Sequence, residues 1–326
     1  MAPPLRHPKV GLMDMRPQLS AGAAPAAARP DLRRLVRRYF LPYLLLSPAL
    51  AGVLVLTVYP LLQTFWLSFH KLTLLHMGKP PSFVGLANYA RLFTDPFFWF
   101  VVRNTVLFTL ACVVLTMLLG LAVGFLLNRP FRGRALLGVT VLLPWVMPKV
   151  AAGIVWKWIF DDQYGVANYL LTRLGLDFRG FSWFTSAPVA FATIVLVVVW
   201  QSFPFIALSV LAGLQSIDPS VLEAAEVDGA TGWQRLRYVI LPMLRNLLVI
   251  LTILSTVWDF KIFDQVYVMT EGGPAQSTYV MGIHAWMAAF GEMQMGQAAA
   301  IAVVMFAILA LVTVAYLRAG REEVAE

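Results

Sequence analysis

Long apolar runs constrain this chain more than any other feature. Runs of about twenty apolar residues recur along the sequence, and a helix needs about that length to cross the roughly 30 Å hydrocarbon core of a bilayer. Of the 326 residues, 60% are hydrophobic and 13% are charged, whereas a soluble domain has a more even balance. Inside a bilayer the backbone polar groups must pair within the chain, which favours helices. The sequence therefore predicts an all-α, multi-pass membrane protein.

Six membrane-spanning helices are predicted within a transmembrane domain of residues 39–320. The expected ranges are 41–68, 99–127, 136–160, 188–212, 239–262 and 298–318. Prolines interrupt several of them, which membrane helices tolerate when packed neighbours satisfy the freed carbonyls; these are Pro60, Pro144, Pro148, Pro204 and Pro242. Gly120 and Gly124 have the spacing of a small-residue helix-packing face. Residues 1–38 are expected to be a disordered basic tail, and residues 321–326 a short second tail.

The basic residues predict the orientation of the spans. Arginines cluster before the first span, after the second, after the fourth and after the sixth, at Arg33, Arg34, Arg37, Arg38, Arg129, Arg132, Arg134, Arg235, Arg237, Arg245, Arg318 and Arg321. Because cytoplasmic loops are enriched in Lys and Arg, both termini and the loop 213–238 are expected in the cytoplasm. This topology explains the net charge of +8 better than binding to nucleic acid does.

Several kinds of chemistry find no support in the sequence. No G-x-x-x-x-G-K-[ST] phosphate loop occurs, so ATP binding of that kind is not expected. The four histidines are scattered without metal-ligand spacing, and no Ser/His/Asp set indicates hydrolysis. The single cysteine, Cys112, lies in an apolar run, where a packed thiol is expected. A membrane enzyme is therefore not indicated.

The polar loop between the fourth and fifth spans carries helix signals. Asp218 followed by Pro219 predicts a helix start, and Asp228-Gly229 predicts its end. Thr231 with Gln234 has the spacing of a capping box. The loop is thus predicted to be a helix, a sharp turn and a second helix that continues into the fifth span.

The same loop carries a longer pattern. Its fixed positions are Glu223-Ala224-Ala225, Gly229, Val239 and Leu241-Pro242. This pattern resembles the signature loop of the transmembrane subunits of binding-protein-dependent ABC importers, with Val239 where Ile is usual. Phe83-Val84-Gly85-Leu86 and the stretch 260–274 resemble carbohydrate importer permeases, in particular the maltose-type "F" subunit.

The resemblance covers residues 40–318 and implies a type I ABC importer permease fold with a cytoplasmic coupling helix. Expected partners are a second permease of the "G" type, a dimer of ATP-binding subunits, an extracytoplasmic solute-binding protein, a sugar and membrane lipid. The location implied is the inner (plasma) membrane of a prokaryote. ATP and Mg²⁺ would bind the ATPase partner, and this chain would bind no cofactor and have no ATPase activity of its own. The coupling residues would be Val221, Leu222, Glu223, Ala224, Ala225, Asp228 and Gly229.

Trp258 and Asp259 lie in a predicted span, where apolar residues would have a lower free energy of insertion into the membrane. An intramembrane carboxylate usually faces a wet cavity or a partner, and a Trp ring with a carboxylate suits sugar binding. The resemblance implies sugar contacts at Val198, Gln201, Ser202, Phe205, Ser255, Trp258, Asp259 and Ile262, and the spacing places each set of four on one helical face. The alternative for these residues is helix packing, or a salt bridge from Asp259 to Lys261, Arg103 or Lys157.

Two other functions remain open from the sequence. A glycerol-3-phosphate-type permease of the same family would favour Lys or Arg in the pathway, whereas the residues expected at the site include an acid and a Trp. A membrane scaffold subunit without a pathway is the alternative of another class, and the two polar-aromatic faces argue against it. The sequence favours import of a neutral disaccharide or oligosaccharide.

Overall fold

The computed structural model describes residues 41–73 and 80–322 and divides into two compact units, residues 1–60 and 61–326. The expected tail of residues 1–38 and the last residues, 323–326, lie outside the described residues. The described part of the first unit consists of α2 (Leu41–Val53), the π-helical turn η2 (Leu54–Val58) and the start of α3 (Tyr59–Leu67). Together these helices form the first candidate span.

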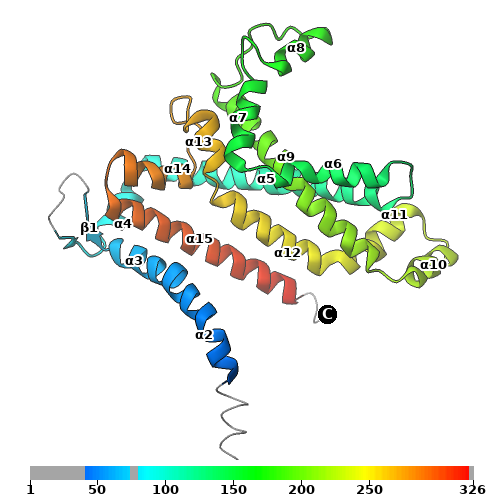
Figure 1. The fold of residues 1–326 in the computed structure, drawn as a ribbon, viewed down its shortest axis with the longest axis horizontal. Helices are drawn as coiled ribbons and strands as arrows, with labels where there is room; N and C mark the ends of the chain where they lie inside the picture. The colour runs from blue at the N-terminus through cyan, green and yellow to red at the C-terminus, as the bar shows by residue number, and fades with distance from the viewer. Residues whose placement is uncertain (1–40, 74–79, 323–326) are drawn as a thin grey trace, which may run out of the picture. The chain divides into compact units, whose positions relative to one another are not determined.

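Most of the second unit is helical. Its long helices are α5 (Pro96–Asn128), α9 (Ala187–Gln215), α12 (Leu241–Phe260) and α15 (Met295–Glu322), which pack against one another as Figure 1 shows. The closest pair is α5 with α9. A Cβ added at Gly120 would lie 2.5 Å from Ile206 side-chain atoms, and Gly124 faces Ala207 and Val210. The small-residue packing face expected on the second span is therefore confirmed.

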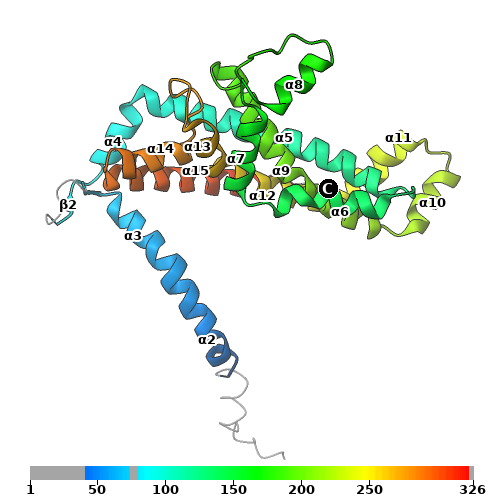
Figure 2. The ribbon, with the colours of Figure 1, turned by 45° about the horizontal axis from the view of Figure 1, so that its top comes forward.

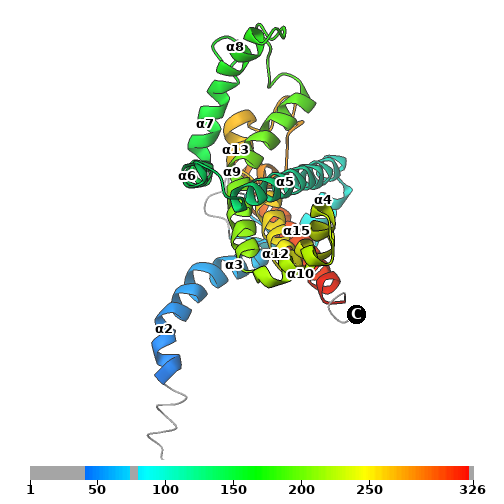
Figure 3. The same ribbon diagram turned by 90° about the vertical axis from the view of Figure 1, so that its right-hand side faces the viewer.

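The third predicted span is not one continuous helix. Residues 136–160 form α6 (Arg134–Val146) and α7 (Lys149–Ile159), which are bent by 101° at the break, as Figure 3 shows. Pro148 has no N–H and disfavours a helical conformation of the residue before it, and Met147 is extended, at φ −67° and ψ 134°. The described residues thus hold five helices able to cross a membrane, or six if this bent pair is one span.

The loops contain short elements. β1 (His70–Lys71) pairs antiparallel with β2 (Ser82–Phe83), so the fold includes one small two-stranded sheet beside its helices. α4 (Ala87–Thr94), α14 (Met281–Trp286) and the π-helical turn η5 (Met287–Gly291) lie at the start of α15, as Figure 2 shows, while α8 (Val166–Arg173) follows α7. α13 (Asp264–Thr270) packs against α7 and α9.

The polar loop folds as its capping signals predict. It contains α10 (Pro219–Val227) and α11 (Gly232–Arg235), and α11 continues through η4 (Leu236–Ile240) into α12. Residues 232–260 therefore form one uninterrupted candidate span of 29 residues. In Figures 1 and 2, α10 and α11 lie together at one end of the long helices, opposite α4 and α14.

Candidate functional site

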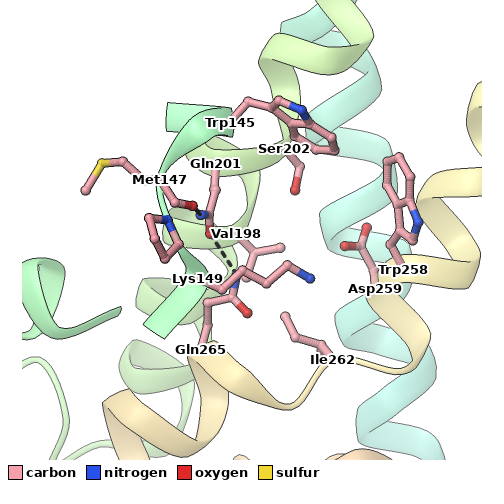
Figure 4. A pocket seen from close by; sticks show the side chains of 11 residues that line it. Trp145, Met147, Lys149, Val198, Gln201, Ser202, Trp258, Asp259, Ile262 and Gln265 are labelled. Atoms are coloured by element: carbon pink, nitrogen blue, oxygen red, sulfur yellow. Dashed lines mark hydrogen bonds between the residues drawn. The ribbon is translucent and has the colours of Figure 1, made fainter. Parts of the chain in front are cut away.

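A cavity of about 420 Å³ opens beside the break between α6 and α7. Its walls come from that break, from α9, from the end of α12 and from the start of α13, as Figure 4 shows. The lining residues are Trp145, Met147, Pro148, Lys149, Val198, Gln201, Ser202, Trp258, Asp259, Ile262 and Gln265. A volume of this size lies within the usual range for a small-molecule site.

The two residue sets expected to contact sugar meet in this cavity. Val198, Gln201 and Ser202 line it from α9, and Trp258, Asp259 and Ile262 line it from the end of α12 and the residues after it. Three residues of each predicted face therefore converge on the cavity, with Ile262 just beyond the end of α12. Helix packing alone, the alternative for these residues, would not place their polar groups around an open cavity.

The remaining two expected contacts lie farther from the cavity. Phe205 lies one turn beyond Ser202, where its ring stacks on Trp145 at 5.0 Å and meets Trp258 edge-on at 5.2 Å between ring centroids. It thus supports the aromatic wall. Ser255 lies one turn before Asp259, is only 2% exposed and is not among the lining residues. The structure therefore brings six of the eight residues onto the cavity wall and a seventh behind it.

A chain of hydrogen bonds fixes the polar side of the cavity. Gln201 Nε2 donates to the Met147 carbonyl oxygen at 2.8 Å, and Gln265 Nε2 donates to Gln201 Oε1 at 2.8 Å. A carbonyl oxygen can only accept, so the amide of Gln201 has one possible orientation, and that orientation in turn sets the amide of Gln265. The break at Met147 is what frees this carbonyl from a helix.

Two buried acceptors at the cavity have no partner among the described residues. They are Asp259 Oδ2 and Gln265 Oε1, and their side chains are 4% and 2% exposed. Buried polar atoms are normally hydrogen-bonded, so these two acceptors lack the partner that such atoms usually have. Asp259 lies beside the indole of Trp258, which offers an apolar face, and Gln265 lies across the cavity from it, as Figure 4 shows.

The salt bridges considered for Asp259 do not form within the described part of the chain. Lys157 Nζ instead donates to the Val268 carbonyl oxygen at 3.4 Å, and the Arg103 guanidinium lies 5.2 Å from the centroid of the Phe100 ring. Lys149, the first residue of α7, lines the same cavity as Asp259. The cavity therefore contains a basic side chain beside the acid and the Trp that the sequence predicts.

Sequence reasoning missed Lys149, Gln265, Trp145 and Met147. A charged residue directly after Pro148 in an apolar run was the available signal for Lys149, because such a residue is costly unless it faces a cavity. Gln265 lies beyond the predicted end of the fifth span. Only the 101° bend brings the start of α7 toward α13, and no local pattern specifies that angle.

The polar loop forms a second candidate site. The Asp218 carboxylate caps α10 by accepting from the Ser220 N–H at 2.9 Å, and hydrogen bonds from Ser220 lower the pKa of Asp218 below its usual value. Thr231 and Gln234 form the predicted capping box at α11. Glu226 and Arg235 make a 2.9 Å salt bridge between the two helices. Gly229 has a φ of 78°, which favours glycine.

The predicted coupling residues do not all face outward. Leu222 packs against the chain's own core with Ile217 and Leu214, and Ala225 is half-buried. Val221, Glu223, Ala224, Asp228 and Gly229 are exposed. Val227, which sequence reasoning did not include, is 88% exposed. The outward apolar surface of α10 is thus formed by Val221, Ala224 and Val227.

The described residues contain no group of three His, Cys, Asp or Glu side chains placed to hold a metal ion. His284 is buried with Nε2 unpaired, and its ring contacts Phe97 edge-on at 5.6 Å. Cys112 is fully buried in the helix core, as expected from the sequence.

Comparison with known proteins connects both sites to one family. Residues 116–321 match the family described as binding-protein-dependent transport system inner membrane component. The sulfoquinovosyl glycerol transport system permease protein SmoG of Agrobacterium fabrum is 40% identical over 85% of this chain and 89% of its own length. The trehalose/maltose transport system permease protein MalF of Thermococcus litoralis is 35% identical over 86% of this chain and 94% of its own length.

A solved structure supports the fold. A chain of a bacterial ABC transporter that imports the acidic polysaccharide alginate superposes with a TM-score of 0.77, at 18% identity, over 89% of this chain and 98% of that chain. The match to the type I importer permease fold and the family match agree with the pattern at residues 223–242. The chain therefore belongs to the binding-protein-dependent transport system inner membrane component family, the multi-pass permease subunits of ABC importers.

Proposed function

We propose that this permease imports a sugar, a disaccharide or an oligosaccharide, through the cavity between α6/α7, α9 and α12. One observation carries the proposal: the two helical faces converge on a single 420 Å³ cavity that combines the Trp258 ring with unpaired acceptors on Asp259 and Gln265. An aromatic face packs on the apolar face of a sugar ring, while buried acceptors take its hydroxyl protons. The trehalose/maltose relative supports a sugar of this size.

Energy for import enters through partner subunits. ABC importer permeases work with ATPase subunits and an external binding protein, and we propose that α10 docks on the ATPase in the cytoplasm. ATP and Mg²⁺ then bind the ATPase, and this chain binds no cofactor. The exposed apolar residues Val221 and Val227 would enter a groove on that partner, as short amphipathic helices do. A second permease of the "G" type completes the pathway, and both termini lie on the ATPase side.

Movement passes from α10 to the cavity along a short path. The Glu226–Arg235 salt bridge joins α10 to α11, and α11 is continuous with α12, whose other end carries Trp258 and Asp259. A shift of α10 on the ATPase would therefore move one wall of the cavity relative to α9. Alternating access needs such a two-state element, biased by ATP.

Uptake by a reconstituted importer tests this function. The full complex with its binding protein is placed in proteoliposomes loaded with ATP, and uptake of radiolabelled maltose, trehalose and maltotriose is measured. Trp258→Ala is expected to abolish uptake while the permease still co-purifies with its partners, and Trp258→Phe is expected to retain part of it. Uptake by Trp258→Ala at the wild-type rate would contradict the assignment of the cavity.

A further inference from the structure

Lys149 is the basic residue that lines the cavity, and it is exposed, whereas Asp259 and Gln265 are buried. It is the first residue of α7, directly after the break at Met147-Pro148, and its side chain is exposed at the open side of the cavity. Figure 4 shows its ammonium group directed across the cavity toward the side that holds Asp259. The Lys149 side chain makes no hydrogen bond or salt bridge to the described residues.

Asp259 faces Lys149 from the end of α12. Asp259 is 4% exposed, its Oδ2 has no hydrogen-bond partner in the described chain, and Figure 4 shows the Lys149 ammonium directed toward its side of the cavity. Two opposite charges at a distance, without a direct salt bridge, leave each group able to hydrogen-bond a third molecule. Each charge alone in this position would be costly, whereas together they give the cavity a net charge of zero.

Gln265 completes the set of free polar atoms. One N–H of its Nε2 donates to Gln201 Oε1, which fixes the orientation of the amide and leaves Oε1 as an acceptor without a partner among the described residues. The cavity thus presents three groups to a ligand: the Lys149 ammonium as a charged donor, and Asp259 and Gln265, each with an unpaired acceptor. Hydroxyl groups can both donate and accept, so an uncharged polyhydroxyl ligand satisfies all three. A phosphate or carboxylate satisfies Lys149 but is repelled by Asp259 and finds acceptors where it needs donors.

We propose that Lys149 is a specificity-determining residue that balances Asp259 across the cavity and so selects uncharged sugars, with Lys149 donating to a sugar oxygen and Asp259 and Gln265 accepting from hydroxyl groups. This inference rests on the proposed sugar-import function. In this role the effect of Lys149 on selectivity depends on the presence of Asp259, which would not be the case for a lysine that only stabilises the fold.

A test that needs no sugar measures the charge of the cavity directly. Ser202→Cys places a thiol on the wall of the cavity, and Cys112, the single native cysteine, is fully buried. The purified importer complex is treated with a cationic (trimethylammonium) and an anionic (sulfonate) methanethiosulfonate reagent of similar size. The ratio of the two rates is then compared among the Ser202→Cys parent, Lys149→Met, Asp259→Asn and the double variant. Labelling of the parent without Ser202→Cys gives the background.

The expected pattern is specific to charge balance. Lys149→Met should shift the rate ratio at least about threefold toward the cationic reagent, Asp259→Asn should shift it similarly toward the anionic reagent, and the double variant should return to the parent ratio. Ser216→Cys, exposed at the end of α9, serves as the control and should show no shift. An unchanged ratio in Lys149→Met would overturn the proposal, because the charge of Lys149 would then have no effect inside the cavity.

Uptake by the same variants tests specificity. With maltose as probe, Lys149→Met and Asp259→Asn should each lower uptake about tenfold or more, and the double variant should lose less than the product of the two losses. Digalacturonate, an acidic disaccharide, should remain a poor substrate of the wild type. If the wild type takes up digalacturonate as fast as maltose, the cavity does not select uncharged sugars and the charge-balance proposal is wrong, whereas sugar import itself stands.

Discussion

Gln265 donates to Gln201 across the boundary between α13 and α9, at 2.8 Å, and Gln201 in turn donates to the carbonyl of Met147 at the break of the third span. These bonds join three segments that are separated by more than fifty residues in the sequence. They hold the bent third span against the cavity and leave Gln265 Oε1 free to accept from a ligand.

Gln201→Leu should damage both stability and uptake. The substitution leaves the Gln265 Nε2 group and the Met147 carbonyl without a partner, and each unsatisfied buried group costs about 1–3 kcal/mol. Thermal unfolding of the detergent-solubilised complex is expected at a lower temperature, with maltose uptake lost. Gln201→Leu combined with Gln265→Leu removes both side-chain amides and should recover part of the stability, because only the Met147 carbonyl is then left without a partner, but it should not recover uptake. Recovery of uptake in the double variant would show that Gln265 does not contact the sugar.

Gly120→Ala should loosen the contact between α5 and α9. A Cβ at this position would lie 2.5 Å from Ile206, closer than packed atoms allow, and overpacking of this kind costs about 1–3 kcal/mol. Gly138→Ala is the matched control, because a Cβ there meets nothing within 4 Å. The melting temperature of Gly120→Ala is expected to fall, and that of Gly138→Ala to stay the same or rise slightly. Equal melting temperatures would mean that the two helices can separate at no cost.

Features that depend on residues close together in the sequence were predicted more completely than features that depend on tertiary packing. The caps at Asp218 and Thr231, the break at Gly229 and the packing face at Gly120 depend on residues a few positions apart, and each is found in the structure. The faces at residues 198–205 and 255–262 follow from helical spacing in the same way. Lys149 and Gln265 join the cavity only through the 101° bend, which depends on how distant segments pack, and Leu222 faces inward for the same reason.

Gly229→Asp should uncouple ATP hydrolysis from uptake. Gly229 lies in the turn between α10 and α11 with a φ of 78° and open space around it, so a side chain changes the turn and the docking surface without a clash in the core. ATPase activity of the complex is expected to continue while sugar no longer stimulates it and uptake falls at least about tenfold.

Gly133→Asp is the control for backbone strain, since Gly133 has a φ of 89° and equally open surroundings before α6. It should retain coupling. Uptake by Gly229→Asp at the wild-type rate would refute the coupling role of the loop.

His284 should make the complex less stable in mild acid. Burial lowers the pKa of His284 below 6.5, the Asp95 charge opposing this only in part. The unfolded chain therefore binds more protons than the folded chain near and below pH 6.5, so stability is full above that pH and decreases as pH falls. The melting temperature of the wild type is expected to drop between pH 7.5 and 5.5. His284→Gln should reduce this drop, and an equal drop in both proteins would exclude His284 as its source.

The most direct measurement of the central claim is protection of the cavity by sugar. The importer carrying Ser202→Cys is combined with its binding protein and arrested by vanadate. Its thiol is then labelled with a small uncharged methanethiosulfonate, with and without maltose, trehalose or maltotriose. The sugar that the wild type takes up should slow labelling at least about fivefold, while Ser216→Cys should be labelled at the same rate throughout. Labelling of Ser202→Cys that a transported sugar leaves unchanged would show that the sugar crosses the membrane elsewhere.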